Sequence, residues 1–238
     1  MRILGIDTST NSTSVCIIED DKLICEYTVN TKKTHSQKLM VMIESMVKES
    51  DLNIKDIDAI AICIGPGSFT GLRISMATAK AIAQVRNLPI IAVNSIESLA
   101  FNMNLCDKII CPILDAQRNQ VYTGKYIFEN GEFKIIEDVK VVTIDELIDE
   151  LSKTNKEFII VGEATNLYKE KLDNLKNTYI ASVSKNVSKA SSLCDIAYMK
   201  FKKDIDVHNC YTINPMYIRK SQAEVQYEEK MKRLENGK

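Results

Sequence analysis

The sequence predicts an α/β protein with two lobes, each built from a mixed sheet flanked by helices. Apolar runs of strand length alternate with segments of helical spacing in the first hundred residues, and this order begins again near Lys108. The chain has 238 residues, a length that fits one bilobal protein or two small domains. Hydrophobic residues make up 45% and charged residues 26% of the chain, as in ordinary globular proteins.

The first lobe is expected to comprise residues 1–105 and to begin with three strands joined by tight turns. These strands are predicted by the apolar runs Arg2–Ile6, Ser14–Ile18 and Leu23–Val29. Thr34 to Gln37 fits a capping box, and apolar residues then recur at helical spacing to about Ser50. A helix is therefore predicted after the third strand.

A fully apolar run, Ile57–Ile64, follows this helix and predicts a buried central or parallel strand. It leads through a glycine-rich loop into a second helix that ends near Val85. A further strand, Pro89–Val93, and a short helix, Ser95–Phe101, complete the lobe.

The second lobe is expected to comprise residues 106–210 and to repeat the first. Apolar runs and turn signals predict strands at Lys108–Leu114, Gln120–Phe128, Phe133–Val142 and Phe158–Val161. Helical spacing predicts helices at Ile144–Leu151, Leu167–Leu175 and Ser191–Lys202. The tail, residues 211–238, is expected to pack back on the first lobe and to be helical beyond Arg219.

The charge of the chain is balanced, with 31 Lys and Arg residues against 32 Asp and Glu residues. A protein that binds nucleic acid by itself usually concentrates basic residues on one face, so autonomous RNA binding is disfavoured. The longest apolar stretch, Ala59–Ile64, is too short to cross a bilayer, so a cytoplasmic protein without a membrane partner is expected. The seven cysteines form no C-x-x-C pair and are expected to be reduced, buried thiols.

Three of the eight glycines lie in the loop Gly65–Gly71, between a predicted strand and a helix. Glycines before a helix N-terminus favour phosphate binding, because they let backbone N–H groups approach an anion. The loop lacks the Lys of a Walker loop and the spacing of a dinucleotide fingerprint. We therefore favour a structural loop that turns the chain and caps the helix with a hydroxyl. Its residues are Gly65, Gly67, Ser68, Thr70 and Gly71.

A polar segment that begins with an acid, Asp7–Thr13, follows the first strand. An acid and hydroxyls in this position could hold a metal–phosphate pair, and Asp115 occupies the matching place in the second lobe. Alternatively, Asx and Ser/Thr turns simply close a hairpin. Both interpretations stay open, and the candidate phosphate residues are Asp7, Thr8, Ser9 and Asp115.

The sequence has two histidines, His35 and His208, and they are not spaced to bind a metal from one helix. His35 lies within the capping box, which favours a contact at the helix start over a catalytic base. No G-x-S-x-G nucleophile elbow is present. We therefore assign no metal ligand and no catalytic residue.

Both helices of the first lobe carry more apolar surface than one sheet requires. Apolar positions of the first helix cover an arc of about 160°, whereas about 100° suffices to face a core. The second helix has two apolar stripes on nearly opposite sides. A protein partner docking on these helices is the functional interpretation. Internal packing between the sheet and a neighbouring helix is the alternative.

Six segments, in this order and spread over nearly the whole chain, resemble the TsaB (YeaZ) family. They are ILGIDTSTNSTSV, THSQKLM, AIAICIGPGSFTGLRISMATAKAIA, AVNSIESLA, LDAQRNQVYTGKY and NPMYIRKSQAE. GPGSFTGLR is highly specific for the family, and the other segments are individually weaker. The resemblance implies the two-lobed fold of actin, sugar kinases and heat-shock chaperone ATPases. It also implies a non-catalytic subunit that binds and activates TsaD in the synthesis of N6-threonylcarbamoyladenosine on tRNA.

The resemblance further implies the partners of the chain. TsaD, which carries a metal-binding H-x-x-x-H pair and receives threonylcarbamoyl-AMP, is expected to form a heterodimer with it, and the ATPase TsaE to join the assembly. tRNA is expected to be contacted only through the complex, the isolated chain to form a homodimer, and no cofactor to be needed. The family places the interface on the first two helices. The predicted interface residues are Ser36, Leu39, Met40, Ile43, Val47, Arg73, Ile74, Ala77 and Ala81.

Two departures from related patterns bear on ligand binding. Relatives often have Asp-Ala-Arg where this chain has Asp115-Ala116-Gln117, followed by Arg118. True kinases usually bind adenosine with a Gly-Gly pair, and Val161-Gly162-Glu163 offers one glycine beside an acid. Nucleotide binding is therefore expected to be weak or absent. The alternative function is an autonomous ATPase or small-molecule kinase of the same fold.

Overall fold

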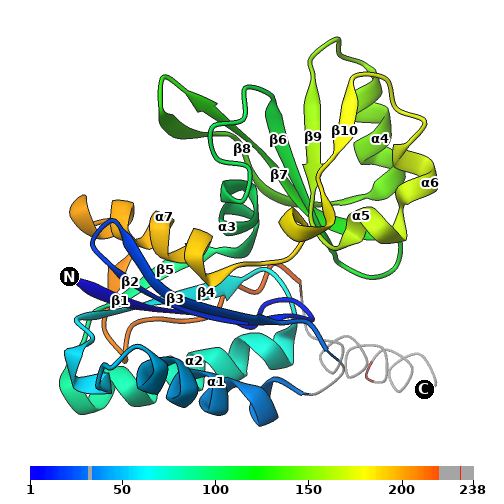
Figure 1. The fold of residues 1–238 in the computed structure, drawn as a ribbon. Helices are drawn as coiled ribbons and strands as arrows, with labels where there is room; N and C mark the ends of the chain where they lie inside the picture. The colour runs from blue at the N-terminus through cyan, green and yellow to red at the C-terminus, as the bar shows by residue number, and fades with distance from the viewer. Residues whose placement is uncertain (32–33, 220–230, 232–238) are drawn as a thin grey trace.

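The computed structural model describes residues 1–31, 34–219 and 231. Two sheets, one in each lobe, form its framework (Figure 1). The first sheet has the order β11-β5-β4-β1-β2-β3, with strands Arg2–Asp7 (β1), Thr13–Glu19 (β2), Lys22–Val29 (β3), Ala59–Gly65 (β4), Ile90–Asn94 (β5) and Val207–His208 (β11). The second has the order β10-β9-β6-β7-β8, with strands Ile109–Asp115 (β6), Gln120–Glu129 (β7), Glu132–Thr143 (β8), Phe158–Val161 (β9) and Thr178–Ile180 (β10).

The two sheets share one topology. The order β3-β2-β1-β4-β5 in the first corresponds to β8-β7-β6-β9-β10 in the second. In each lobe the first three strands pair antiparallel, and the fourth and fifth run parallel to the first. The prediction of two similar halves is confirmed.

Helices cover both faces of the first sheet (Figure 1). On one face lie α1 (His35–Glu49) and α2 (Phe69–Arg86), and on the other lies α7 (Ala190–Lys202). The other helices are α3 (Ser95–Phe101), α4 (Ile144–Ser152), α5 (Ala164–Leu167) and α6 (Lys169–Leu172), with short 3₁₀ helices at Ile54–Asp56 and Val183–Lys185. Across the described residues, every helix is too short or too polar to span a membrane.

The first sheet is buried on both sides because its central strands are almost wholly apolar. Along β1, Leu4 and Ile6 pack in the core under α1 and α2, whereas Ile3 packs in the core under α7. Between the lobes, the ring of Phe101 on α3 lies 5.4 Å from Phe128 and 5.3 Å from Phe133, measured between centroids. The lobes are therefore joined by an apolar contact as well as by the chain.

The boundary of the second lobe differs from the expected range 106–210. The chain returns to the first lobe at Ala190, where α7 packs on β1, β2, β4 and β5, and β11 then pairs with β5. Leu193, Cys194 and Ala197 of α7 are fully buried there. The physical reason is that α1 and α2 share one face of the sheet, so the apolar residues of the other face need this helix to cover them.

Two further segments bear on the predictions. The prediction of a single helix over Leu167–Leu175 is wrong. Two separate helices, α5 and α6, meet at Tyr168, whose φ of −113° is not helical. In the tail, Ile213 is fully buried in the first core. The helix predicted beyond Arg219 lies outside the described residues, apart from Met231.

Candidate functional site

A cleft of about 430 Å³ lies between the two lobes. From the first lobe it is lined by the loop between β1 and β2 and by the loop Gly65–Gly71; from the second, by the loop between β6 and β7 and by Glu163 after β9. The C-terminal segment Met216–Arg219 also lines it. Its position follows from the topology, because the carboxyl ends of parallel strands are where α/β sheets form crevices.

The two first-lobe loops pack backbone against backbone. The Ser68 N–H donates to the Ser9 carbonyl at 2.7 Å, and the Thr8 hydroxyl donates to the Gly71 carbonyl at 2.7 Å. A Cβ at Gly67 would overlap the Ser9 carbonyl oxygen, and a Cβ at Gly71 would overlap that of Thr8. This close approach therefore requires glycine at both positions.

The same loop forms the start of α2. Ser68 is the N-cap residue, and its hydroxyl accepts a hydrogen bond from the Gly71 N–H at 3.2 Å. Thr70, the other predicted cap, is exposed in the first turn. Gly65 has a φ of +110°, a conformation that side chains rarely adopt. These contacts are those of a loop whose glycines serve packing and chain reversal.

Asp7 is buried beneath the loops and does not line the cleft. One of its oxygens, Oδ1, accepts from the N–H of Ser9 at 2.8 Å and from its hydroxyl at 2.6 Å, while Oδ2 has no partner in the described chain. Burial raises the pKa of Asp7 and outweighs the hydrogen bonds from Ser9. Of the four candidate phosphate residues, only Ser9 and Asp115 line the cleft, so the structure does not bring the four together there.

The second-lobe side of the cleft carries both signs of charge. Asp115 is exposed and accepts from the Gln117 N–H at 2.8 Å, and Arg118 lies nearby. Glu163 is half-buried; burial raises its pKa, and the charges of Asp115 and Asp7 add to this effect. No cluster of three or more His, Cys, Asp and Glu side chains suited to a metal occurs among residues 1–31, 34–219 and 231.

Sequence reasoning did not select Glu163 or the segment Met216–Arg219 as site residues. Glu163 follows β9, the strand that corresponds to β4, and the loop after β4 also lines the cleft. The internal repeat was therefore the signal that could have identified Glu163. The C-terminal segment reaches the cleft because the Met216 N–H donates to the Ile64 carbonyl at 2.7 Å and the Arg219 guanidinium donates to the Ala116 carbonyl. No local sequence pattern specifies such long-range contacts.

A second candidate site is the outward side of α1 and α2, which lie side by side on the first sheet (Figure 1). Met40, Val41 and Val85, which lie on these two helices, are exposed over 54%, 60% and 87% of their surface. We call this surface the α1–α2 face. It consists of the exposed residues Ser36, Met40, Val41, Arg73, Ala77, Ala81 and Val85 and the half-buried residues Val47 and Ile74.

Two of the predicted interface residues do not lie on this face. Leu39 and Ile43 are 1% and 3% exposed and belong to the core between α1 and the sheet. They lie at the centre of the predicted apolar arc, which is the side that packs on the strands, so only the margin of the arc, at Met40 and Val47, remains for a partner. Val41, which was not selected, is exposed on the outer side of α1.

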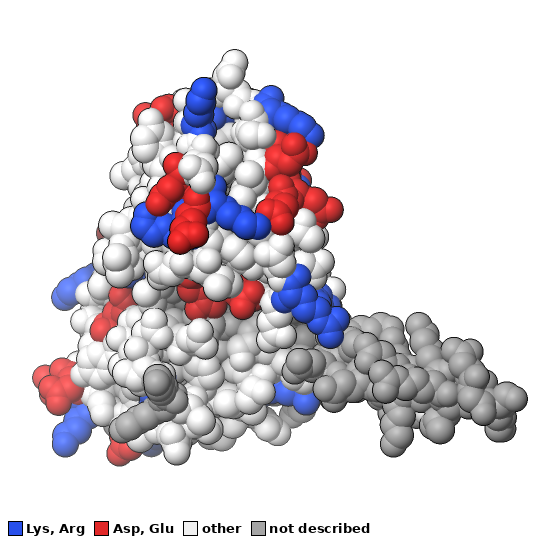
Figure 2. All heavy atoms as spheres, turned by 90° about the vertical axis from the view of Figure 1, so that its right-hand side faces the viewer, with Lys and Arg blue, Asp and Glu red and all other residues white. Residues whose placement is uncertain are grey.

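The surface charge is mixed where the second lobe faces outward. Figure 2 shows the side of the molecule that carries α4 and α6, and positive and negative side chains alternate over it. The described residues on this side therefore present no continuous basic surface of the kind that binds nucleic acid without a partner.

Comparison with known proteins places the chain among relatives. A family model described as "TsaD: tRNA N6-adenosine threonylcarbamoyltransferase" matches residues 23–227. The chain is 33% identical over 234 residues to the tRNA threonylcarbamoyladenosine biosynthesis protein TsaB of Bacillus subtilis (strain 168), and the match covers 98% of this chain and 100% of that protein.

Two solved structures share the fold. YeaZ from Pseudomonas aeruginosa superimposes with a TM-score of 0.77 at 21% identity, covering 91% of this chain and 99% of that one. An activator of the 2-hydroxyisocaproyl-CoA dehydratase from Clostridium difficile with bound ADPNP has a TM-score of 0.51 at 10% identity, covering 86% and 97%.

A repeated five-stranded topology in two lobes, with a cleft at the carboxyl ends of the strands, defines the actin-like class that also includes sugar kinases. The expected fold class is confirmed. Within this class the chain belongs to the TsaB (YeaZ) family, and its match to the TsaD model relates it in fold to the transferase.

Proposed function

We propose that this protein acts in the synthesis of tRNA N6-threonylcarbamoyladenosine as the non-catalytic subunit that binds and activates a TsaD transferase. The observation that carries the proposal is the α1–α2 face, where large apolar side chains remain exposed. The TsaB relative is named for this biosynthesis, which supports the same process for this chain. Because the TsaD model also matches this chain, equivalent helices of two related chains can pair about a pseudo-two-fold axis.

The histidines of the sequence support a subunit without transferase chemistry. His35 and His208 are not spaced as a helical metal pair, and His35 Nδ1 is engaged with the Thr13 hydroxyl at 2.8 Å. The cleft raises the alternative of an autonomous ATPase or kinase. Its carboxylates Asp115 and Glu163 disfavour a phosphate group in the absence of a cation. ATP turnover by the purified chain would support this alternative.

Further partners are proposed on the same basis. Free copies of this chain are proposed to pair through the α1–α2 face, so that a homodimer forms when TsaD is absent. TsaE is proposed to join the heterodimer, and tRNA to be contacted only within the assembled complex. The balanced charge of the chain supports this division of roles.

Co-purification with the TsaD of the same organism tests the proposal. Met40→Glu and Ala77→Glu each place a charge on the α1–α2 face, where an interface would strip it of water, so both variants should lose TsaD and become monomeric by light scattering. Val183→Glu is the matched control, because Val183 is 80% exposed on the second lobe, away from this face. Folded Met40→Glu and Ala77→Glu variants that still bind TsaD as the wild type does would rule this face out.

A further inference from the structure

The N-terminal turn of α2 carries an ordered stack of two aromatic rings and one guanidinium group. The rings of Phe69 and Tyr217 are stacked, with centroids 4.6 Å apart and planes 29° from parallel. The guanidinium carbon of Arg73 lies 4.0 Å from the Phe69 ring centroid, and Arg73 Nε donates to the Tyr217 hydroxyl at 3.3 Å. Three contacts therefore link three side chains that come from the start of α2 and from the C-terminal segment.

The C-terminal segment fixes the position of Tyr217 in this stack. On one side, the Met216 N–H donates to the Ile64 carbonyl at 2.7 Å. On the other side, the Arg219 guanidinium donates to the Ala116 carbonyl of the second lobe. Because Met216 before it and Arg219 two residues after it are both held by backbone carbonyls, the Tyr217 ring and hydroxyl occupy a defined place beside α2.

Arg73 is held by its Nε and by the face of its guanidinium, and within the described part of the chain the rest of that group is not engaged. The side chain is exposed, and its Nη1 and Nη2 atoms make no hydrogen bond or ion pair with residues 1–31, 34–219 or 231. Two parallel N–H donors on a planar group match the two oxygens of a carboxylate. Since the stack restricts the side chain before any partner arrives, less conformational entropy is lost on binding.

We infer that Arg73 anchors the partner of the α1–α2 face by binding a carboxylate side chain of that partner, with Phe69 and Tyr217 as positioning residues. This inference rests on the proposed function, because it names the group that the same face recognises. Arg73 lies one helical turn before Ala77 and two before Ala81, so a partner helix that covers these alanines also reaches the guanidinium. Arginine beside aromatic rings at the edge of an apolar face is typical of residues that dominate binding energy.

The dissociation constant of the complex with TsaD, measured at low and high salt, tests this inference. Arg73→Ala should weaken binding about tenfold or more, and Arg73→Lys should restore little of it, because lysine keeps the charge but not the paired donors. The increase of the dissociation constant with salt should be smaller for Arg73→Ala than for the wild type. Tyr217→Phe, which keeps the ring stack and removes only the acceptor for Nε, should weaken binding by a smaller factor.

Lys203→Ala is the control, because it removes one exposed positive charge at the end of α7, on the other side of the sheet. It should bind TsaD with the affinity and salt dependence of the wild type. Arg73→Gln replaces Arg73→Ala if the alanine variant does not unfold cooperatively.

The outcomes separate the two proposals. Arg73→Ala with a dissociation constant within about twofold of the wild type, or with an unchanged salt dependence, would overturn the anchoring role. If Ala77→Glu abolishes binding in the same experiment, the proposed function stands while this inference fails. A wild-type chain that does not bind TsaD contradicts the proposed function itself.

Discussion

Gly67 shows how one backbone position supports the walls of the cleft. Its missing side chain lets the loop before α2 pack against the Ser9 carbonyl, and the Ser68 N–H bonds to that carbonyl. Gly67→Val should lower the free energy of unfolding by about 1–3 kcal/mol, because one of the two loops must move. Chemical denaturation of the purified variant measures this loss.

A second glycine provides the control for this measurement. Gly131 lies in the turn between β7 and β8, and a Cβ there would meet no atom within 4 Å. Its φ of +79° is in the left-handed region that asparagine also tolerates, so Gly131→Asn should leave stability nearly unchanged. If Gly67→Val were as stable as Gly131→Asn but changed ligand binding in the cleft, the loop would serve a ligand rather than the fold.

Asp7 predicts a dependence of stability on pH. Since burial raises its pKa, the native state binds the proton more tightly than the unfolded state does. The contribution of this residue to stability must therefore fall as pH rises from about 4, the ordinary pKa of Asp, through its raised native value. Asp7→Asn keeps an acceptor for Ser9 and removes the charge. Denaturation at pH values from 4 to 8 should show the free energy of unfolding of the variant rising relative to that of the wild type. A difference that stays constant over this range would contradict a raised pKa for Asp7.

The candidate sites show what residue patterns can and cannot specify. Ser68 was predicted as a possible cap because a hydroxyl before a helix has a local partner. The burial of Leu39 was predictable, because it lies at the centre of the apolar arc of α1 and the centre of such an arc faces the core. The approach of Tyr217 to Phe69 joins positions far apart in the chain, and no local signal encodes such a contact.

Most secondary-structure elements follow from apolar periodicity. The helix Ser95–Phe101 and the strand Phe158–Val161 have the predicted bounds, because caps and turn residues delimit both of them. The placement of α7 was missed for a different reason. An apolar stripe does not specify which sheet it covers, and in the structure that of α7 packs on the side of the first sheet opposite α1 and α2.

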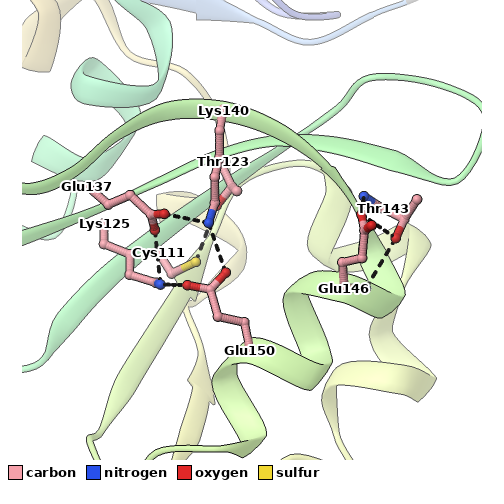
Figure 3. A network of polar contacts seen from close by, with 8 residues as sticks. All are labelled: Cys111, Thr123, Lys125, Glu137, Lys140, Thr143, Glu146 and Glu150. Carbon is pink, nitrogen blue, oxygen red and sulfur yellow. Dashed lines mark hydrogen bonds and ion pairs between the residues drawn. The ribbon is translucent and has the colours of Figure 1, made fainter.

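A network of four charged side chains joins β7, β8 and α4 in the second lobe (Figure 3). Lys140 pairs with Glu137 at 2.5 Å and with Glu150 at 2.9 Å, and Lys125 contacts the same two carboxylates, that of Glu137 at 3.0 Å. Burial, the largest single influence, raises the pKa of Glu150, but the two lysines together outweigh it and the pKa is lowered. The network therefore fastens α4 to the sheet most strongly when Glu150 is ionised.

Glu150→Gln should lower stability by about 1 kcal/mol at pH 7, because it removes the charge that both lysines share. A lowered pKa contributes stability above the unfolded value, and this contribution is lost as pH falls through the native value. The difference between variant and wild type should thus shrink on acidification below about pH 4. Glu170→Gln, an exposed change on α6, serves as control. A difference that persists at low pH would show that the network acts through packing rather than charge.

At the scale of the whole molecule, the two candidate surfaces are distinct but connected. The cleft lies between the lobes, whereas the α1–α2 face lies on the outer side of the first lobe. The segment Met216–Arg219 touches both, since Tyr217 contacts Phe69 and Arg73 of α2 while Arg219 contacts the second lobe. A partner bound on the face is therefore next to the contacts that tie the lobes together.

The most direct test of the proposed function is tRNA modification in a reconstituted assay with threonylcarbamoyl-AMP as donor. TsaD together with this protein should modify tRNA faster than TsaD alone, this protein alone should modify none, and Ala77→Glu should abolish the stimulation while Val183→Glu retains it. Modification by this protein without TsaD would contradict a non-catalytic role. Stimulation by Ala77→Glu equal to that of the wild type would contradict activation through the α1–α2 face.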